Sequence, residues 1–383
     1  MKLKTFSLFL FLMAGASPFA FAQVVPPPSQ PEPVPPTEQT ILPVLGYSSD
    51  YGFFAGGFYQ RISFDHDLPF SSELILDITA STKLDLMSGL TYQRLQTFGK
   101  PVRSRIRIDA ERQRNSGYYG IGNDTEFESS LREDDVYFFE NRNVSIQYTA
   151  RKKIADAPYL GQLDIFGLGS VAWGNGISGG DETLFARERP AGFDSSWMNK
   201  IGFGFVADSR DSEFIPTYGV RHEIELANSN SLLGSDYSNT SLKADLRHFT
   251  KLLPGVVLAH KLQYERIMGD APFWGLSIIG HQNGLRGFHE NRFRGDSSIL
   301  SMLELRSWLF AFLDDQIRVG IQGFWDTGRV FSDFDSNRFF DDWKQSYGFG
   351  GALSVFDTSL IIRGDIGFSN ESTRIYFGTG YTF

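Results

Sequence analysis

Hydrophobic and polar residues alternate one by one along most of the chain. In residues 104–113, Ile106, Ile108 and Ala110 alternate with Arg105 and Arg107. The same period of two recurs in residues 84–92, 201–206, 220–226 and 242–247. Successive side chains of a β-strand point to opposite faces, so this period predicts strands. Beyond the N-terminal region, no stretch approaches the roughly 18 uncharged apolar residues of a transmembrane helix.

The polar faces of these strands carry charges and glycines, while tyrosine and phenylalanine cluster near the strand ends. This is typical of a transmembrane β-barrel, with an apolar outside, a wet interior and aromatic girdles. Such a sheet must close, because an open edge in hydrocarbon leaves backbone groups unpaired. A soluble β-sandwich also alternates and remains the alternative.

The length predicts the number of strands. Residues 46–383 comprise 338 residues, and a spanning strand with its connection takes about 21 residues. We therefore predict an all-β fold, a transmembrane antiparallel barrel of about sixteen strands. Twelve or fourteen strands with longer loops also fit.

The N-terminal region predicts export. Lys2 and Lys4 precede an apolar run, and Ala20-Phe21-Ala22 provides a cleavage site, so residues 1–22 are predicted to be a secretory signal peptide. A membrane anchor is the alternative. Residues 23–45 are rich in proline and are predicted to be an extended, disordered periplasmic linker, with the barrel at 46–383.

Composition argues against catalytic and metal chemistry. The chain has no cysteine, a formal net charge of -9, and six histidines scattered along the sequence. It has no zinc-binding histidine motif, no nucleophile elbow and no phosphate-binding loop. We predict no cofactor, no metal site, no catalytic residue and no nucleic-acid partner, because nucleic-acid binding needs a basic surface.

Three segments carry a family resemblance. The first, at 203–219, holds a hairpin motif; the second, at 284–306, holds a loop motif; the third is 323–330. The hairpin motif is Asp208, Arg210, Asp211, Pro216 and Gly219, and the loop motif is Leu285, Arg286, Gly287 and Phe288. Together they resemble the BamA/TamA-type superfamily of outer-membrane assembly factors, also called bacterial surface antigens. Residues 118–125 look like an early strand of these barrels.

The resemblance implies a role for the loop motif. In the family this loop folds into the lumen, and its arginine pairs with carboxylates that correspond to Glu304 and Asp326. The alternation independently places both acids on polar faces. We expect this cluster to lock the loop and to support the seam between the first and last strands; an ordinary lumen ion pair is the alternative. Asp208 and Arg210 share a face and are expected to organise a hairpin.

The two ends of the barrel are predicted to meet weakly. The first strand is expected within 47–60, and the last is 374–383, with Gly378 and Gly380 lacking stiffening side chains. Phe377 and Phe383 are expected to share a face. Phe383 resembles the terminal signal of Gram-negative outer-membrane barrels, which the cell's own barrel-assembly machinery inserts.

The resemblance implies a protein of the bacterial outer membrane, reached after export across the inner membrane. It implies that the barrel aids insertion or translocation of proteins or lipids by local membrane distortion and lateral opening of the seam. Expected partners are outer-membrane lipids, lipopolysaccharide and unfolded membrane-protein clients. The family's periplasmic polypeptide-transport-associated domains are not evident before the barrel. A passive pore or structural barrel is the second hypothesis, and an outer-membrane hydrolase the third.

Overall fold

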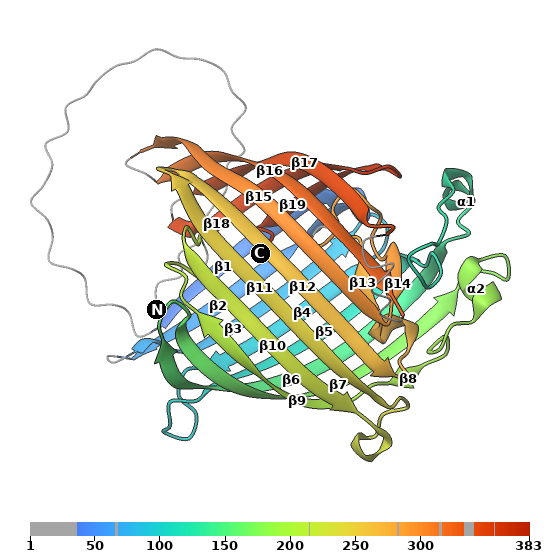
Figure 1. Ribbon diagram of the computed structural model, residues 1–383, viewed down its shortest axis with the longest axis horizontal. Coiled ribbons are helices and arrows are strands. Elements are labelled where there is room, and N and C mark those ends of the chain that lie inside the picture. Colours follow the sequence, from blue (N-terminus) through green and yellow to red (C-terminus); the bar gives the residue numbers. More distant parts are fainter. Residues whose placement is uncertain are drawn as a thin grey trace, which may run out of the picture.

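A computed structural model of the protein describes residues 37–383, except residues 66, 67, 214, 282, 314, 315, 333–340 and 356. Within these residues, sixteen antiparallel strands form the wall of a barrel, which closes where β1 (Thr37–Ser48) meets β19 (Thr373–Thr379) (Figure 1). The predicted all-β barrel of about sixteen strands is confirmed. The predicted signal peptide and the proline-rich residues before Thr37 lie outside the described residues.

The other wall strands follow in chain order. They are β2 (Gly52–Asp65), β3 (Leu68–Ser81), β4 (Leu86–Arg94), β5 (Arg103–Gly117), β6 (Phe138–Ala157), β7 (Gly161–Ser178), β9 (Lys200–Asp208), β10 (Gly219–Ser229), β11 (Asn239–Leu253), β12 (Val256–Gly269), β15 (Ser297–Phe312), β16 (Ile317–Phe331), β17 (Lys344–Val355) and β18 (Asp357–Phe368). The two-residue β8 (Ser196–Trp197) pairs with the end of β7.

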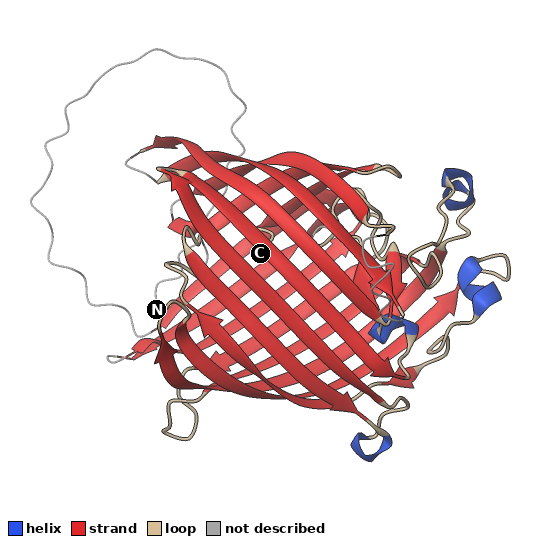
Figure 2. Ribbon diagram, viewed as in Figure 1, coloured by secondary structure: helices blue, strands red, loops and turns tan. Residues whose placement is uncertain are grey.

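The two ends of the barrel differ in their connections. Residues 254–255 join β11 to β12 at one end, whereas residues 118–137 and 270–296 form long connections at the other. The short helices α1 (Ser129–Glu133) and α2 (Leu184–Glu188) belong to the long-connection end (Figure 2). No helix in the described part of the chain is long and apolar enough to cross a membrane. Membrane barrels have short periplasmic turns and longer outer loops, and from this we infer that the short-turn end faces the periplasm.

Apolar side chains of the wall point outward and polar side chains point into the lumen, as the alternation predicts. On β10, Ile224 and Leu226 point outward and remain exposed. Inside the barrel, Lys243 of β11 and Glu265 of β12 form an ion pair at 2.9 Å. The outward-facing apolar residues form a belt around the barrel. On β2, β4, β5 and β6, outward-facing arginines mark the two edges of this belt. They are Arg61 and Arg94 toward the short-turn end, and Arg112 and Arg142 toward the long-connection end.

The first strand begins earlier than expected. β1 starts at Thr37, inside the segment predicted to be linker (23–45), so residues 47–60 contain the end of β1 and most of β2 rather than the first strand. All twelve residues of β1 pair with β2, including Pro43 opposite Gly57. A proline has no N–H to donate, and it is tolerated here because most of β1 is unpaired on its other side.

Residues 118–125 are not the strand that the resemblance suggested. β5 ends at Gly117, and Gly120 and Gly122 take φ values of +87° and +125°, which an extended strand cannot contain. Tyr118 instead packs against Phe139, with ring centroids 6.4 Å apart. These residues therefore belong to a connection that folds over the long-connection end.

Candidate functional site

The connection 270–296 folds back into the barrel. Within it, β13 (Ser277–Ile279) pairs with β14 (Phe293–Gly295), and the residues between them form what we call the inserted loop (280–292). Leu285 and Phe288 of this loop are fully buried in an apolar core. That core also contains inward-facing residues of the wall: Phe249, Ala259, Leu300, Met302 and Val330. The inserted loop is thus anchored by burial as well as by polar contacts.

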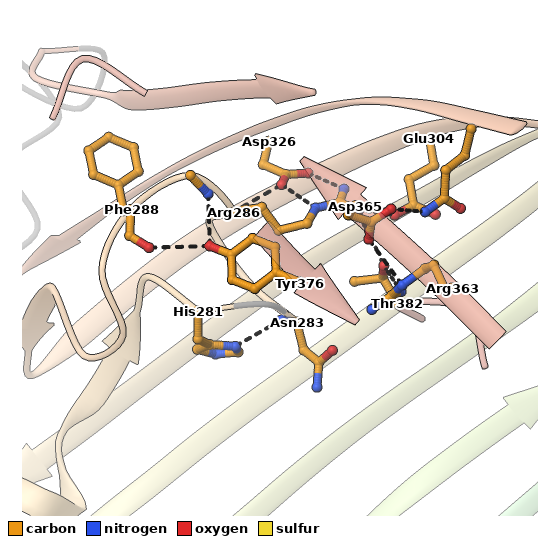
Figure 3. Close-up of polar contacts among 12 residues, drawn as sticks. His281, Asn283, Arg286, Phe288, Glu304, Asp326, Arg363, Asp365, Tyr376 and Thr382 are labelled. Atoms are coloured by element: carbon orange, nitrogen blue, oxygen red, sulfur yellow. Dashed lines mark hydrogen bonds and ion pairs between the residues drawn. The ribbon is translucent and has the colours of Figure 1, made fainter. Parts of the chain in front are cut away.

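Arg286 lies at the centre of a buried ion-pair network (Figure 3). Its Nε and Nη2 donate to the two carboxylate oxygens of Asp326 at 2.7 and 2.8 Å, and Nη1 donates to Glu304 at 2.5 Å. The guanidinium also lies 3.5 Å from the ring centroid of Phe324. The structure therefore places both nominated carboxylates against Arg286, with the fork geometry that strengthens arginine–carboxylate pairs.

Further charges complete this network. Arg306 donates to Glu304 at 2.8 Å, and Arg363 lies 3.0 Å from Asp365. With Arg286 and Asp326, these residues form what we call the six-charge cluster, three arginines and three carboxylates. Because buried charges are tolerated only when paired, the cluster is stable as a unit and vulnerable to loss of any member.

Gly287 brings the inserted loop against the hairpin between β18 and β19. Its φ is +90°, and a Cβ there would lie 2.9 Å from the carbonyl carbon of Phe368. Its N–H donates to the Tyr376 hydroxyl at 3.0 Å, while its carbonyl accepts from Ser369 and Ser372 at 2.9 and 2.7 Å. Glycine is required at this position by both conformation and space.

The inserted loop also contacts the turn between β1 and β2. The backbone N–H of Glu290 donates to Asp50 at 3.2 Å, and the Tyr51 hydroxyl donates to the Glu290 carboxylate. Asp50 forms an ion pair with Arg374 of β19. The inserted loop, the first hairpin and the last strand therefore meet at one point.

The seam between β1 and β19 is joined only near the long-connection end. Among the described residues, Ser48 is the one residue of β1 that pairs with β19, and its partner is Tyr376. Beyond it, the Ser49 N–H donates to the Ile375 carbonyl at 3.0 Å, and the Ile375 N–H donates to Ser49 Oγ at 2.9 Å. By contrast, all seven residues of β19 pair with β18. Residues 37–47 of β1 have no registered partner on β19.

The C-terminus turns into the lumen instead of continuing the last strand. β19 ends at Thr379, Gly380 takes a φ of +74°, and Phe383 is buried. The expectation that Phe377 and Phe383 share a face is wrong, because Arg306 donates to the Phe383 carbonyl at 3.2 Å and holds it inside. A role of Phe383 as an insertion signal stays a prediction.

The hairpin motif builds the turn between β9 and β10 at the short-turn end. Asp208 ends β9 and accepts two hydrogen bonds from the Arg210 guanidinium, at 2.9 and 2.8 Å, and one from the Arg210 backbone N–H at 3.2 Å. Gly219 begins β10 with a φ of +101°, and Pro216 is buried within the turn. These residues position one another, as expected of a structural turn.

Asp211 stabilises the same turn from within. Its carboxylate accepts the Thr217 N–H at 2.8 Å and the Tyr218 N–H at 3.3 Å. Burial acts to raise the pKa of Asp211, but the hydrogen bonds from Thr217 and Tyr218 outweigh it and leave the pKa below its usual value. Asp211 therefore remains an acceptor at neutral pH.

The strand register gathers histidines that are scattered in the sequence. His248 lies opposite His260 on β12, and its Nε2 is 3.2 Å from Nε2 of His222 on β10. No group of three or more metal-ligating side chains is placed to hold an ion, as far as the described residues extend.

These features define a class of protein: a transmembrane barrel with a loop anchored in its lumen and a partly joined seam. A sequence model of the Omp85 superfamily domain matches residues 71–383, and the chain belongs to this superfamily. The predicted resemblance to BamA/TamA-type barrels is confirmed. Omp85 barrels lie in the bacterial outer membrane and are generally assembly or transport factors.

Solved structures agree with this assignment at the level of the fold. BamA from Haemophilus ducreyi lacking POTRA domains 1-3 has a TM-score of 0.60 at 14% identity, over 89% of this chain and 70% of that one. CdiB from Acinetobacter baumannii has a TM-score of 0.54 at 12% identity, over 91% and 60%. CdiB from Escherichia coli has a TM-score of 0.56 at 11% identity, over 91% and 63%. The chain thus spans less than two thirds of the CdiB chains. No curated protein matches it significantly.

Proposed function

We propose that this barrel aids the insertion or translocation of proteins or lipids at the outer membrane by distorting the bilayer locally and opening the seam between β1 and β19. The observation that carries the proposal is that, among the residues the structure describes, Ser48 with Tyr376 is the single pair that joins β1 to β19 in register. Membership in the Omp85 superfamily supports the general role of assembly or transport.

An incomplete seam leaves backbone groups of β1 unpaired, and these groups can bind a chain that enters from the membrane. Unpaired N–H and C=O groups in hydrocarbon are costly, so the free edge of β1 favours pairing with a strand of an incoming chain. Opening the joined part requires loss of the Ser48–Tyr376 pairing, the Ser49–Ile375 hydrogen bonds and the Asp50–Arg374 ion pair. This is far less than the loss of a full ladder.

The inserted loop is in a position to control the seam. Gly287 is bound to the β18–β19 hairpin, and Glu290 is bound to the β1–β2 turn. We propose that the six-charge cluster locks the loop in the lumen and that the locked loop keeps both sides of the seam in place. Release of the loop would then favour opening.

A disulfide across the joined part of the seam tests this function. The chain contains no cysteine, so Ser49→Cys with Ile375→Cys introduces a single defined pair on facing residues. Purified barrel is reconstituted into liposomes, and the folding rate of an unfolded outer-membrane barrel and the scrambling of labelled lipid are measured. We expect the oxidised variant to lose its acceleration of these processes and the reduced variant to regain it.

The two single-cysteine variants serve as controls, since oxidation should leave both unchanged. Equal rates for the oxidised and reduced double variant would refute a role for seam opening. If no variant accelerates either process while the barrel conducts ions in planar bilayers, the alternative of a passive pore would replace the proposal.

A further inference from the structure

The outer wall carries an apolar groove beside the seam. It has a volume of about 500 Å³ and crosses the wall from β1 to β5. Its floor contains three small residues, Gly57 of β2, Ser88 of β4 and Ala110 of β5. Ser88 and Ala110 are neighbours across the sheet, whereas the exposed Ile78 of β3 stands between Gly57 and Ser88. A Cβ at Gly57 would meet no atom within 4 Å, so the space above it is open.

One side of the groove is a row of large side chains. Successive residues in this row are Ile41, Tyr59, Leu76, Leu90 and Ile108, which pair in register from β1 to β5. All of them belong to the outward-facing set that contacts the bilayer. The groove therefore runs across the strands, with one end against β1, the strand at the incomplete seam.

The dimensions of the groove match a lipid chain. Four strand spacings separate β1 from β5, about 19 Å at about 4.8 Å per strand. One leaflet of hydrocarbon is about 15 Å thick, so an acyl chain that lies obliquely between the row of large side chains and Ile78 has a comparable length. A β-strand added by a client would instead lie alongside β1 and pair with its edge. It would not follow a groove that crosses the strands.

A cation lies next to the groove, just beyond the row of large side chains on its short-turn side. Arg61 is the next outward residue on β2 after Tyr59 toward the short-turn end, and it is exposed. Its neighbours in register are the uncharged Gln39 and Leu74. Within the described part of the chain, Arg61 forms no ion pair. A guanidinium binds a phosphate through two parallel hydrogen bonds.

We propose that this surface is a binding site for one glycerophospholipid of the periplasmic leaflet, with an acyl chain in the groove and the phosphate at Arg61. The leaflet follows from the position of Arg61 toward the short-turn, periplasmic end of the barrel. The bound lipid lies against β1. The lipid site requires only a folded barrel in a bilayer. A negative result in the disulfide experiment on the seam would therefore not contradict it.

Photo-crosslinking tests this site directly. The barrel is reconstituted into liposomes of phosphatidylethanolamine and phosphatidylglycerol that contain a trace of phosphatidylglycerol with a diazirine in one acyl chain. After irradiation, adducts are mapped by mass spectrometry of peptides. We expect adducts to be several-fold enriched on β2–β5 relative to the lipid-facing wall of β10–β12. An even distribution around the belt would overturn the proposal.

Two substitutions test the acyl-chain groove and the phosphate contact separately. Gly57→Leu fills the floor and is expected to reduce the enrichment several-fold, whereas Gly323→Leu, at an outward glycine of β16 with similarly open space, should leave it unchanged. Arg61→Gln should also reduce it several-fold. Heat-modified gel migration verifies that each variant is folded. Unchanged adducts in Gly57→Leu would refute the acyl-chain site, and unchanged adducts in Arg61→Gln would refute the phosphate contact.

Discussion

Replacement of Arg286 by alanine is expected to lower the free energy of unfolding of the barrel by about 3–5 kcal/mol. The side chain is fully buried, and its loss leaves Asp326 and Glu304 inside the barrel without their shared cation. The free energy is measured by urea unfolding in detergent, and the temperature at which the folded form is lost is read from unboiled samples on gels.

The matched control is Arg107→Ala, which removes an arginine–aspartate pair that is exposed in the lumen. Arg107 and Asp109 are 2.5 Å apart with side chains about 40% exposed, so water screens the pair and its loss should cost only about 0–1 kcal/mol. Equal stability losses in both variants would contradict a special role for the six-charge cluster.

Substitution of Gly287 by alanine is expected to displace the inserted loop from the β18–β19 hairpin. A left-handed conformation costs a non-glycine residue about 1–2 kcal/mol, and the added Cβ would lie 2.9 Å from a backbone atom of Phe368, which cannot move without distorting the hairpin. The variant should therefore be destabilised by more than the conformational cost alone. Urea unfolding and protease cleavage within residues 280–292 report the change.

Gly99→Ala provides the comparison. Gly99 has a φ of +67°, but a Cβ added there would have no atom within 4 Å, so the substitution has a similar conformational cost without the steric clash. We expect Gly287→Ala to lose clearly more stability and to expose the inserted loop to protease. If the two variants behave alike, close packing at Gly287 does not hold the loop.

The sequence was sufficient to predict the wall and one part of the site. Lipid outside and water inside force successive residues to differ in polarity, so each strand carries its own signal. The same alternation placed Glu304 and Asp326 on the inner face, where both are found against Arg286. Arg363 and Asp365, which complete the six-charge cluster, were missed because no motif draws attention to them.

The errors arise where a distant contact overrides a local pattern. Alternation continues through the last residues, yet Gly380 allows a turn and Arg306 holds Phe383 in the lumen from 77 residues away in sequence. Likewise, Pro43 made β1 look like linker, because a sequence does not reveal which strand will have an unpaired edge.

The seam itself is tested most directly by spin labels in this cysteine-free chain. One pair is placed across the seam, at Leu45→Cys and Thr379→Cys, and one across the complete β1–β2 ladder, at Leu45→Cys and Ala55→Cys, which are register partners. All three positions face outward. We predict a longer and broader distance distribution across the seam than across the ladder. Two equally narrow, short distributions would show a fully paired seam and contradict the account.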